Sequence, residues 1–265
     1  MAILGYITRR PRIRRSPPER FHLFVSYTIR EDETRIIKPI VDHFLNSILR
    51  PLIEQTIGEP PAFYDGYTLY HPAGSGISTF ALENVLRFAI EESEVLVAFV
   101  SPAYVGSKWC RFECRAMVSK KLRPWFDLCR LPPISQLQDH RLPSERPDWW
   151  ECVLSRFLMW QRRLHGRPSQ PGGAIVAVRW KGDLDPIGKM PELVGVPLFD
   201  WTSCLRAFEA SERLHSHLLR HGSVSPAWEE EAKAAGEDCC EAMSVTAKQL
   251  VAILQERRLR YAHSK

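Results

Sequence analysis

Short apolar runs recur along the chain, separated by longer stretches in which apolar residues follow helical spacing. The clearest runs are FHLFVSY (21–27), PAFYDG (61–66), EVLVAFVS (94–101) and AIVAVRW (174–180). Continuous apolar runs of this length are typical of strands that are covered on both faces. A further short run, VGVPLFDW (194–201), predicts an edge strand.

Helical patterns lie between these runs. Residues 31–58 and 77–93 carry apolar side chains at helical spacing, and Ser107 is a suitable N-cap for a helix that contains Trp109 and Glu113. The alternation of strand and helix predicts an α/β fold with a flavodoxin-like, doubly wound parallel sheet.

Two further segments extend this pattern. Residues 121–173 contain many prolines and are interpreted as an insertion after the third helix, whereas residues 203–259 are mostly helical with a break at HGSVSP. Both are rich in Trp, Leu and Phe, so we expect them to pack on the sheet. The predicted organisation is a basic flexible arm (1–20), a domain (21–201) with the insertion (121–173), and a helical extension (202–265) packed on that domain.

The net charge of +5 comes from one stretch of the chain. The overall composition, 45% hydrophobic and 25% charged over 265 residues, is that of a globular protein. Residues 9–20 (RRPRIRRSPPER) hold six arginines and three prolines, and without them the body is near neutral. We expect this arm to be solvated, extended and dispensable for the fold. RNA, an acidic partner or an anionic surface are alternative ligands of the arm, and no other part of the chain suggests nucleic acid.

The seven cysteines do not follow a metal-binding or disulfide pattern. They are Cys110, Cys114, Cys129, Cys152, Cys204, Cys239 and Cys240. Without CxxC spacing or paired Cys and His ligands, they indicate reduced thiols in a cytoplasmic protein and no metal site. Neither a signal peptide nor a membrane span is expected, because no apolar run is long enough.

Polar residues at the ends of the predicted strands form the candidate site, because ligands of doubly wound sheets bind beyond the carboxyl ends of the strands. They are Ser26, Tyr27 and Thr28 after the first strand, Asp65 after the second, Ser101 after the third, and Trp109 and Glu113 one helical turn or so further on. The loop 66–77 adds glycines and three aromatic residues, Tyr67, Tyr70 and His71. It is neither a GxGxxG motif nor a P-loop, so a dehydrogenase or kinase would lack its phosphate cradle.

Each candidate also has a purely structural interpretation. Ser26 and Thr28 are suited to capping the next helix as well as to contacting a ligand, and Asp65 is a common turn former. Tyr67 is suited to packing within its loop.

The helix with Trp109 and Glu113 has such an interpretation too. It can be an ordinary amphipathic helix with a solvated Glu113 and Trp109 in the core. Cys110 and Cys114 on that helix fit small core residues better than a thiol pair.

Together, FHLFVSYT, FYDG, the glycine-bearing loop, LRFAIEESEVLVAFVSPAYVGSKWCRFE and AIVAVRW resemble a Toll/interleukin-1 receptor-like (TIR) domain, in the order that this family uses. The resemblance covers residues 21–119 and 174–201, and it is closer to stand-alone prokaryotic members of antiviral defence than to receptor tails. Two departures are the segment 121–173, where the family has a short link, and a longer loop after FYDG.

The resemblance implies an enzyme that cleaves NAD at the nicotinamide–ribose bond, because many members use a glutamate four residues after a tryptophan. Glu113 and Trp109 match that pair. The nicotinamide of NAD is cationic and leaves as a neutral molecule, so the reaction needs no general acid. An ionised Glu113 stabilises the positive charge that develops on the ribose, and Trp109 offers a flat wall to the base. NAD is then a substrate, and no cofactor is expected.

Two other functions are compatible with these residues. One is a non-enzymatic TIR scaffold that signals through self-association, and the other is an enzyme similar to nucleoside deoxyribosyltransferases. For the enzyme, we expect activation by self-association or by a partner defence protein. The sequence leaves open whether the product is ADP-ribose, cyclic ADP-ribose or a derivative, since access of water to the cleft decides this.

Overall fold

The computed structural model describes residues 21–28, 31–65, 86–87, 89–122, 174–182, 190–193 and 195–263. Its five strands form one parallel sheet in the order β2-β1-β3-β4-β5. They are β1 (Phe21–Ser26), β2 (Phe63–Asp65), β3 (Ser93–Val100), β4 (Ala174–Arg179) and β5 (Leu198–Asp200). This order is that of a flavodoxin-like doubly wound sheet, so the predicted fold class is confirmed.

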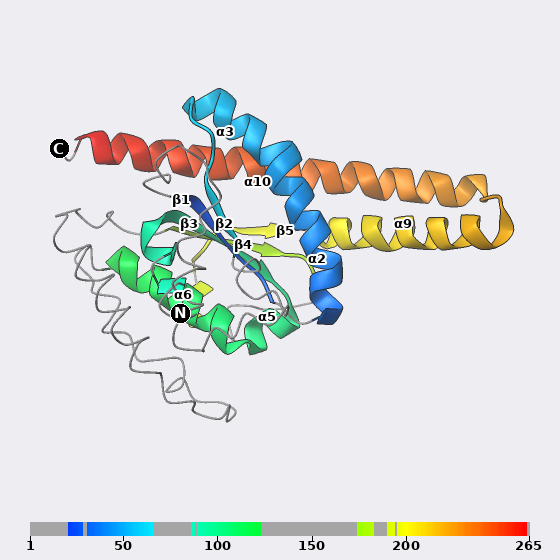
Figure 1. The fold of residues 1–265 in the computed structure, drawn as a ribbon, viewed down its shortest axis with the longest axis horizontal. Coiled ribbons are helices and arrows are strands. Elements are labelled where there is room, and N and C mark those ends of the chain that lie inside the picture. The colour runs from blue at the N-terminus through cyan, green and yellow to red at the C-terminus, as the bar shows by residue number, and fades with distance from the viewer. Residues whose placement is uncertain are drawn as a thin grey trace, which may run out of the picture.

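Helices cover both faces of the sheet (Figure 1). They are α2 (Glu31–His43), the π-helix η1 (Phe44–Leu49), α3 (Arg50–Ile57), α5 (Pro102–Gly106), α6 (Lys108–Leu122), the 3₁₀-helix η5 (Pro191–Leu193), α9 (Thr202–His221) and α10 (Pro226–His263). Alternate strand residues supply two apolar layers. Leu23 and Val25 face the side covered by α2, η1, α3 and α10, whereas Phe24 and Leu96 face α5 and α6.

The helical pattern of residues 31–58 is one continuous coil with a π-helical turn inside it. Phe44, Leu45 and Leu49 of η1 are buried, and Pro51 follows in the first turn of α3. A proline has no N–H to donate, and its ring clashes with the carbonyl of the residue four positions earlier. The wider π turn accommodates this defect while its apolar side chains stay on the sheet. Gly58 ends α3 in the left-handed conformation, with φ 79°.

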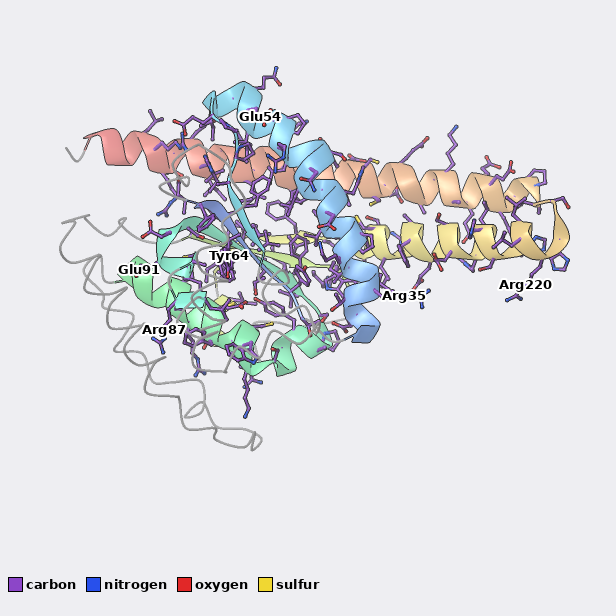
Figure 2. All side chains as sticks on the ribbon, viewed as in Figure 1. Arg35, Glu54, Tyr64, Arg87, Glu91 and Arg220 are labelled. Carbon is purple, nitrogen blue, oxygen red and sulfur yellow. The ribbon has the colours of Figure 1, made fainter. Side chains whose placement is uncertain are left out.

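The last two helices form an antiparallel hairpin that runs past the sheet (Figure 1). The second half of α10 is packed, since Met243, Ala247, Leu250 and Leu254 are buried in the same layer as Trp201. The other end of the hairpin is exposed, and Arg220 lies there (Figure 2). Among the described residues, no helix combines the length and the apolar character that crossing a bilayer requires.

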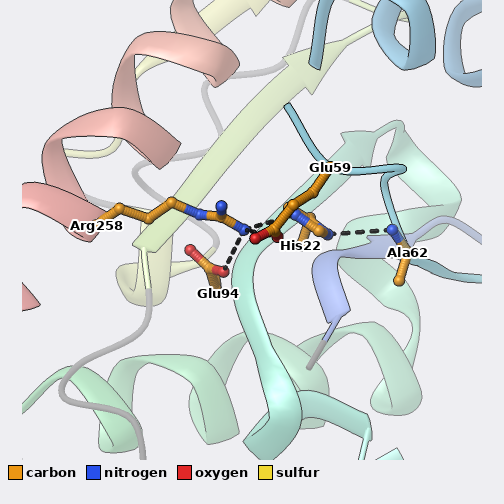
Figure 3. Close-up of polar contacts among 5 residues, drawn as sticks. All are labelled: His22, Glu59, Ala62, Glu94 and Arg258. Carbon is orange, nitrogen blue, oxygen red and sulfur yellow. Dashed lines mark hydrogen bonds and ion pairs between the residues drawn. The ribbon is translucent and has the colours of Figure 1, made fainter. Parts of the chain in front are cut away.

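A histidine joins the start of β1 to the end of α10 (Figure 3). His22 is 5% exposed. Its Nδ1 accepts the N–H of Ala62 at 3.1 Å, and Nη2 of Arg258 lies 2.8 Å from its Nε2. The same guanidinium contacts Glu59 at 3.2 Å and Glu94 at 3.8 Å. Burial, followed by the charge of Arg258, lowers the pKa of His22 from 6.5 to about 4, although Glu59 opposes the shift.

This lowered pKa predicts a loss of stability in mild acid. Below pH 6.5 the unfolded chain binds a proton at His22 that the folded chain binds only near pH 4, so the free energy of unfolding falls as the pH falls. We expect the wild type to lose about 2 kcal/mol between pH 8 and pH 5 relative to His22→Gln. Urea unfolding of both proteins over this range checks the expectation, and parallel pH profiles would contradict it.

Several predictions lie outside the described residues. These are the arm 1–20, the loop 66–77 with Tyr67, and residues 123–173 of the predicted insertion. They remain predictions. Residues 121 and 122 are the end of α6.

Candidate functional site

The candidate site lies where the order of the strands reverses. β1 and β3 are neighbours in the sheet, and the chain leaves them toward opposite faces, through α2 and through α5 and α6. In doubly wound folds this switch point opens a crevice beyond the carboxyl ends of the strands. Ser26 ends β1, and Ser101 follows the last residue of β3.

Glu113 reaches this point from α6. The hydroxyl of Ser107 accepts the N–H of Cys110 at 3.4 Å, so the predicted N-cap of α6 is confirmed. Glu113 lies on the second turn of the helix and is only 5% exposed. Its carboxylate accepts a short hydrogen bond from the hydroxyl of Ser26. The structure therefore brings together two residues that the sequence places 87 positions apart.

Tyr104, which the sequence analysis missed, joins the two strand ends. Its hydroxyl lies 2.8 Å from Oγ of Ser26 and 3.3 Å from Sγ of Cys114, and its backbone N–H donates to Oγ of Ser101 at 3.1 Å. Burial, with smaller effects of the nearby thiols and of Glu113, raises the pKa of Tyr104 well above 10. The hydroxyl is therefore neutral and can donate a hydrogen bond.

A second buried carboxylate approaches from the other face of the sheet. Glu33 on α2 is 4% exposed, and it accepts the hydroxyl of Ser101 at 2.5 Å. Nζ of Lys181, just beyond β4, lies 3.5 Å from its other oxygen. The sequence analysis missed Glu33 because it belongs to the acidic run Glu31–Asp32–Glu33, which looks like an exposed first turn of a helix. A continuous chain of contacts thus runs from Glu113 through Ser26, Tyr104 and Ser101 to Glu33.

The two cysteines beside Glu113 belong to the core, as predicted. Cys110 and Cys114 are 3% and 0% exposed, and both are free thiols. Burial raises the pKa of Cys114 to about 12 and moves that of Cys110 in the same direction. Neither thiol is ionised near neutral pH, so neither is suited to be a nucleophile.

The structure also places most of the other predicted site residues. Trp109 is half-buried against the layer that contains α6. Tyr27 packs in the opposite layer, because it follows Ser26 and points to the other face. Thr28 is buried, and its carbonyl accepts the hydroxyl of Thr34, which fixes the start of α2. Asp65 ends β2 beside Val25, and Tyr67 lies outside the described residues.

This arrangement fixes one carboxylate on each side of the switch point. A carboxylate that hydroxyl groups hold in one position is suited to stabilise a cation. In the part of the chain that the structure describes, no group of three or more His, Cys, Asp or Glu side chains is placed to hold a metal ion.

Fold and site together define a flavodoxin-like α/β domain with a buried carboxylate at its switch point. Within it, residues 76–124 match the family model described as the TIR domain. This span contains Ser101, Tyr104, Trp109 and Glu113, and so the chain includes a segment similar to TIR domains at the candidate site itself. No curated protein and no solved structure matches the chain.

Proposed function

We propose that this chain cleaves NAD at the bond between nicotinamide and ribose, as an NAD glycohydrolase or an ADP-ribosyl cyclase. The observation that carries the proposal is the position of Glu113. It lies at the switch point, inside the segment that matches the TIR domain, and its carboxylate is held by Ser26. We further propose that the reaction depletes NAD or makes a nucleotide signal in cytoplasmic antiviral defence.

The chemistry needs one well-placed carboxylate. As the bond to nicotinamide breaks, its electron pair moves to the pyridinium ring, and positive charge develops on the ribose. An ionised Glu113 beside the ribose stabilises that charge, and the hydroxyl of Ser26 keeps the carboxylate in one orientation. Attack by water then gives ADP-ribose, whereas attack by a nitrogen of the adenine gives a cyclic product.

The burial of Glu113 supports regulation of this activity. At 5% exposure the carboxylate is covered, so a ribose can reach it only after neighbouring groups move. We propose that self-association or a partner defence protein favours the open arrangement. A protein with two such states is inactive until a partner binds the open one more tightly.

A non-enzymatic scaffold is the second candidate function. The burial of Glu113 supports this function as well. A covered carboxylate that accepts from Ser26, whose hydroxyl also contacts Tyr104, suits a purely structural role. The two functions differ in one respect. A scaffold gains nothing from the charge of Glu113, whereas the enzyme requires it.

Replacing Ser26 tests the proposal. Ser26→Ala removes the hydrogen bond to Glu113, and we expect nicotinamide release by the assembled protein to fall about 10- to 100-fold, since hydrogen bonds to charged groups contribute about 1.5–3 kcal/mol. The matched control is Ser93→Ala. Ser93 is equally buried, but it lies at the amino end of β3, away from the switch point. Its hydroxyl donates to the carbonyl of Ala89.

We expect Ser93→Ala to keep the rate within about fivefold of the wild type, the effect of roughly 1 kcal/mol. Chromatography of nicotinamide at fixed NAD and protein concentrations gives both rates. Equal losses in the two variants, or no loss in Ser26→Ala, would contradict a catalytic role for this contact.

A further inference from the structure

Two cysteines meet where α9 lies against α10. Cys204 is in the first turn of α9 and is 1% exposed, whereas Cys239 on α10 is half-buried. Sγ of Cys204 donates to the backbone oxygen of Cys239 at 3.7 Å, and the two side chains belong to the same apolar cluster. The contact joins residues 35 positions apart, across the two helices of the hairpin.

We propose that Cys204 and Cys239 are an oxidation site, at which hydrogen peroxide converts the two thiols into a disulfide that links α9 to α10. The site is separate from the switch point and does not depend on NAD cleavage. The two thiols differ in exposure, which assigns them different roles. Cys239 can meet a small oxidant, whereas the buried Cys204 can react only with its neighbour.

The protonation of the pair agrees with these roles. The neighbouring Cys204 thiol lowers the pKa of Cys239 below its ordinary value. The contact with Cys239, together with burial, raises the pKa of Cys204. Cys239 is therefore the first of the two to ionise, and a thiolate is the reactive form of cysteine. The partial burial of Cys239 acts against its ionisation, so we expect a slow reaction.

The chemistry balances with one peroxide molecule. The thiolate of Cys239 attacks a peroxide oxygen, the O–O bond breaks, and the leaving hydroxide takes a proton to become water. This gives a sulfenic acid on Cys239. The sulfur of Cys204 then attacks the sulfur of Cys239, the S–O bond breaks, and the second hydroxide takes the proton of Cys204. Two thiols lose two electrons in total, and peroxide gains them.

The other described cysteines lack this combination. Cys110 and Cys114 are buried, and their pKa values are raised. Cys240 is exposed, and it follows Cys239 on the helix, so its side chain points in another direction. In the described part of the chain, no group of three ligating side chains could hold a metal ion. A pair of thiols without a third ligand is suited to disulfide formation rather than to metal binding.

The position of the pair gives the disulfide a structural consequence. Beyond Cys239, α10 packs on the sheet through Met243, Ala247 and Leu250, whereas before it the helix is largely exposed. A bond at this boundary joins α9 to α10 where the exposed part of the hairpin begins. The disulfide would close a loop between residues 35 positions apart, which restricts the unfolded chain. We therefore expect oxidation to raise the thermal midpoint by on the order of 5 °C.

Site-resolved mass spectrometry tests the proposal. The full chain is treated with hydrogen peroxide, remaining thiols are blocked with N-ethylmaleimide, and the protein is digested without reductant. We expect a peptide pair linked through Cys204 and Cys239, which dithiothreitol separates, and a rise in thermal midpoint that reverses with it. Cys240→Ser should give the same result. Cys204→Ser should instead leave a sulfenic acid on Cys239 that dimedone traps, with no rise in thermal midpoint.

Other outcomes would overturn the proposal. One is that Cys204 and Cys239 are still alkylated after peroxide has oxidised other cysteines. The other is a disulfide through Cys240 between two copies of the chain. Because the readout is a peptide mass, the result is independent of NAD cleavage.

Discussion

Glu113→Gln is expected to lower NAD cleavage by the assembled protein at least 100- to 1000-fold. Glutamine keeps the volume of the side chain and an oxygen that can accept from Ser26, but it removes the charge that offsets the developing ribose cation. Preorganised groups of this kind contribute about 3–4 kcal/mol to the transition state. We expect the free energy of unfolding to change by only about 1 kcal/mol, because the packing around the residue is unchanged.

The chain offers a matched control for this substitution. Glu94 is a carboxylate of similar burial, 7% exposed, that lies 3.8 Å from Arg258 at the start of β3, at the opposite end of the strand from the switch point. Glu94→Gln should therefore perturb the fold to a similar extent, while the rate of cleavage stays within about fivefold of the wild type. Equal losses of rate in the two variants would assign the effect to structure, and a Glu113→Gln protein with a near wild-type rate would remove Glu113 from catalysis.

Trp201→Ala is expected to destabilise the fold by about 3–5 kcal/mol, the usual cost of deleting a large core aromatic side chain. Trp201 is fully buried, and its ring makes edge contacts with Phe44 at 4.8 Å and Phe99 at 5.3 Å between centroids. Its indole N–H donates to the hydroxyl of Thr246 at 2.9 Å. One side chain thus joins η1, β3 and α10, so its loss leaves a cavity between sheet and hairpin.

Trp201→Phe separates the two contributions. Phenylalanine keeps most of the packing and loses only the hydrogen bond to Thr246, which contributes about 0.5–1.5 kcal/mol. Chemical denaturation of both variants measures the difference. If the two substitutions have the same small effect, the hairpin does not depend on this contact.

The strands could be predicted because each is a continuous apolar run. EVLVAFVS becomes β3, which is buried at every position, and AIVAVRW becomes β4. Parallel strands covered on both faces leave this pattern in a sequence. The rule that ligands bind beyond the strand ends then selected Ser26 and Glu113, and the structure brings these two into contact.

The rest of the site depends on contacts between distant positions, which local patterns do not record. Glu33 and Ser101 are 68 positions apart, and Arg258 and His22 are 236 apart. In the sequence, Tyr104 looks like one more apolar residue of a short helix. Tyr27 packs in the layer on the other face from Ser26, because adjacent strand residues point to opposite faces, and its role in the site stays a prediction.

The environment of Glu113 also differs from its simplest interpretation. Helical spacing alone is compatible with a solvated carboxylate and a core tryptophan. In the structure the carboxylate is buried and the tryptophan is only half-buried. The carboxylate can be buried because the hydroxyl of Ser26 replaces water as its hydrogen-bond partner.

The fate of NAD in the presence of the assembled chain tests the central claim most directly. The purified wild-type protein, alone and with lysate from stressed cells, is incubated with NAD under crowding conditions, and mass spectrometry follows all nucleotides. Light scattering on the same samples reports assembly. The proposed function predicts that nicotinamide appears one for one with ADP-ribose, its cyclic form or a derivative. NAD that stays intact while the protein is demonstrably assembled would contradict the enzyme and favour the scaffold.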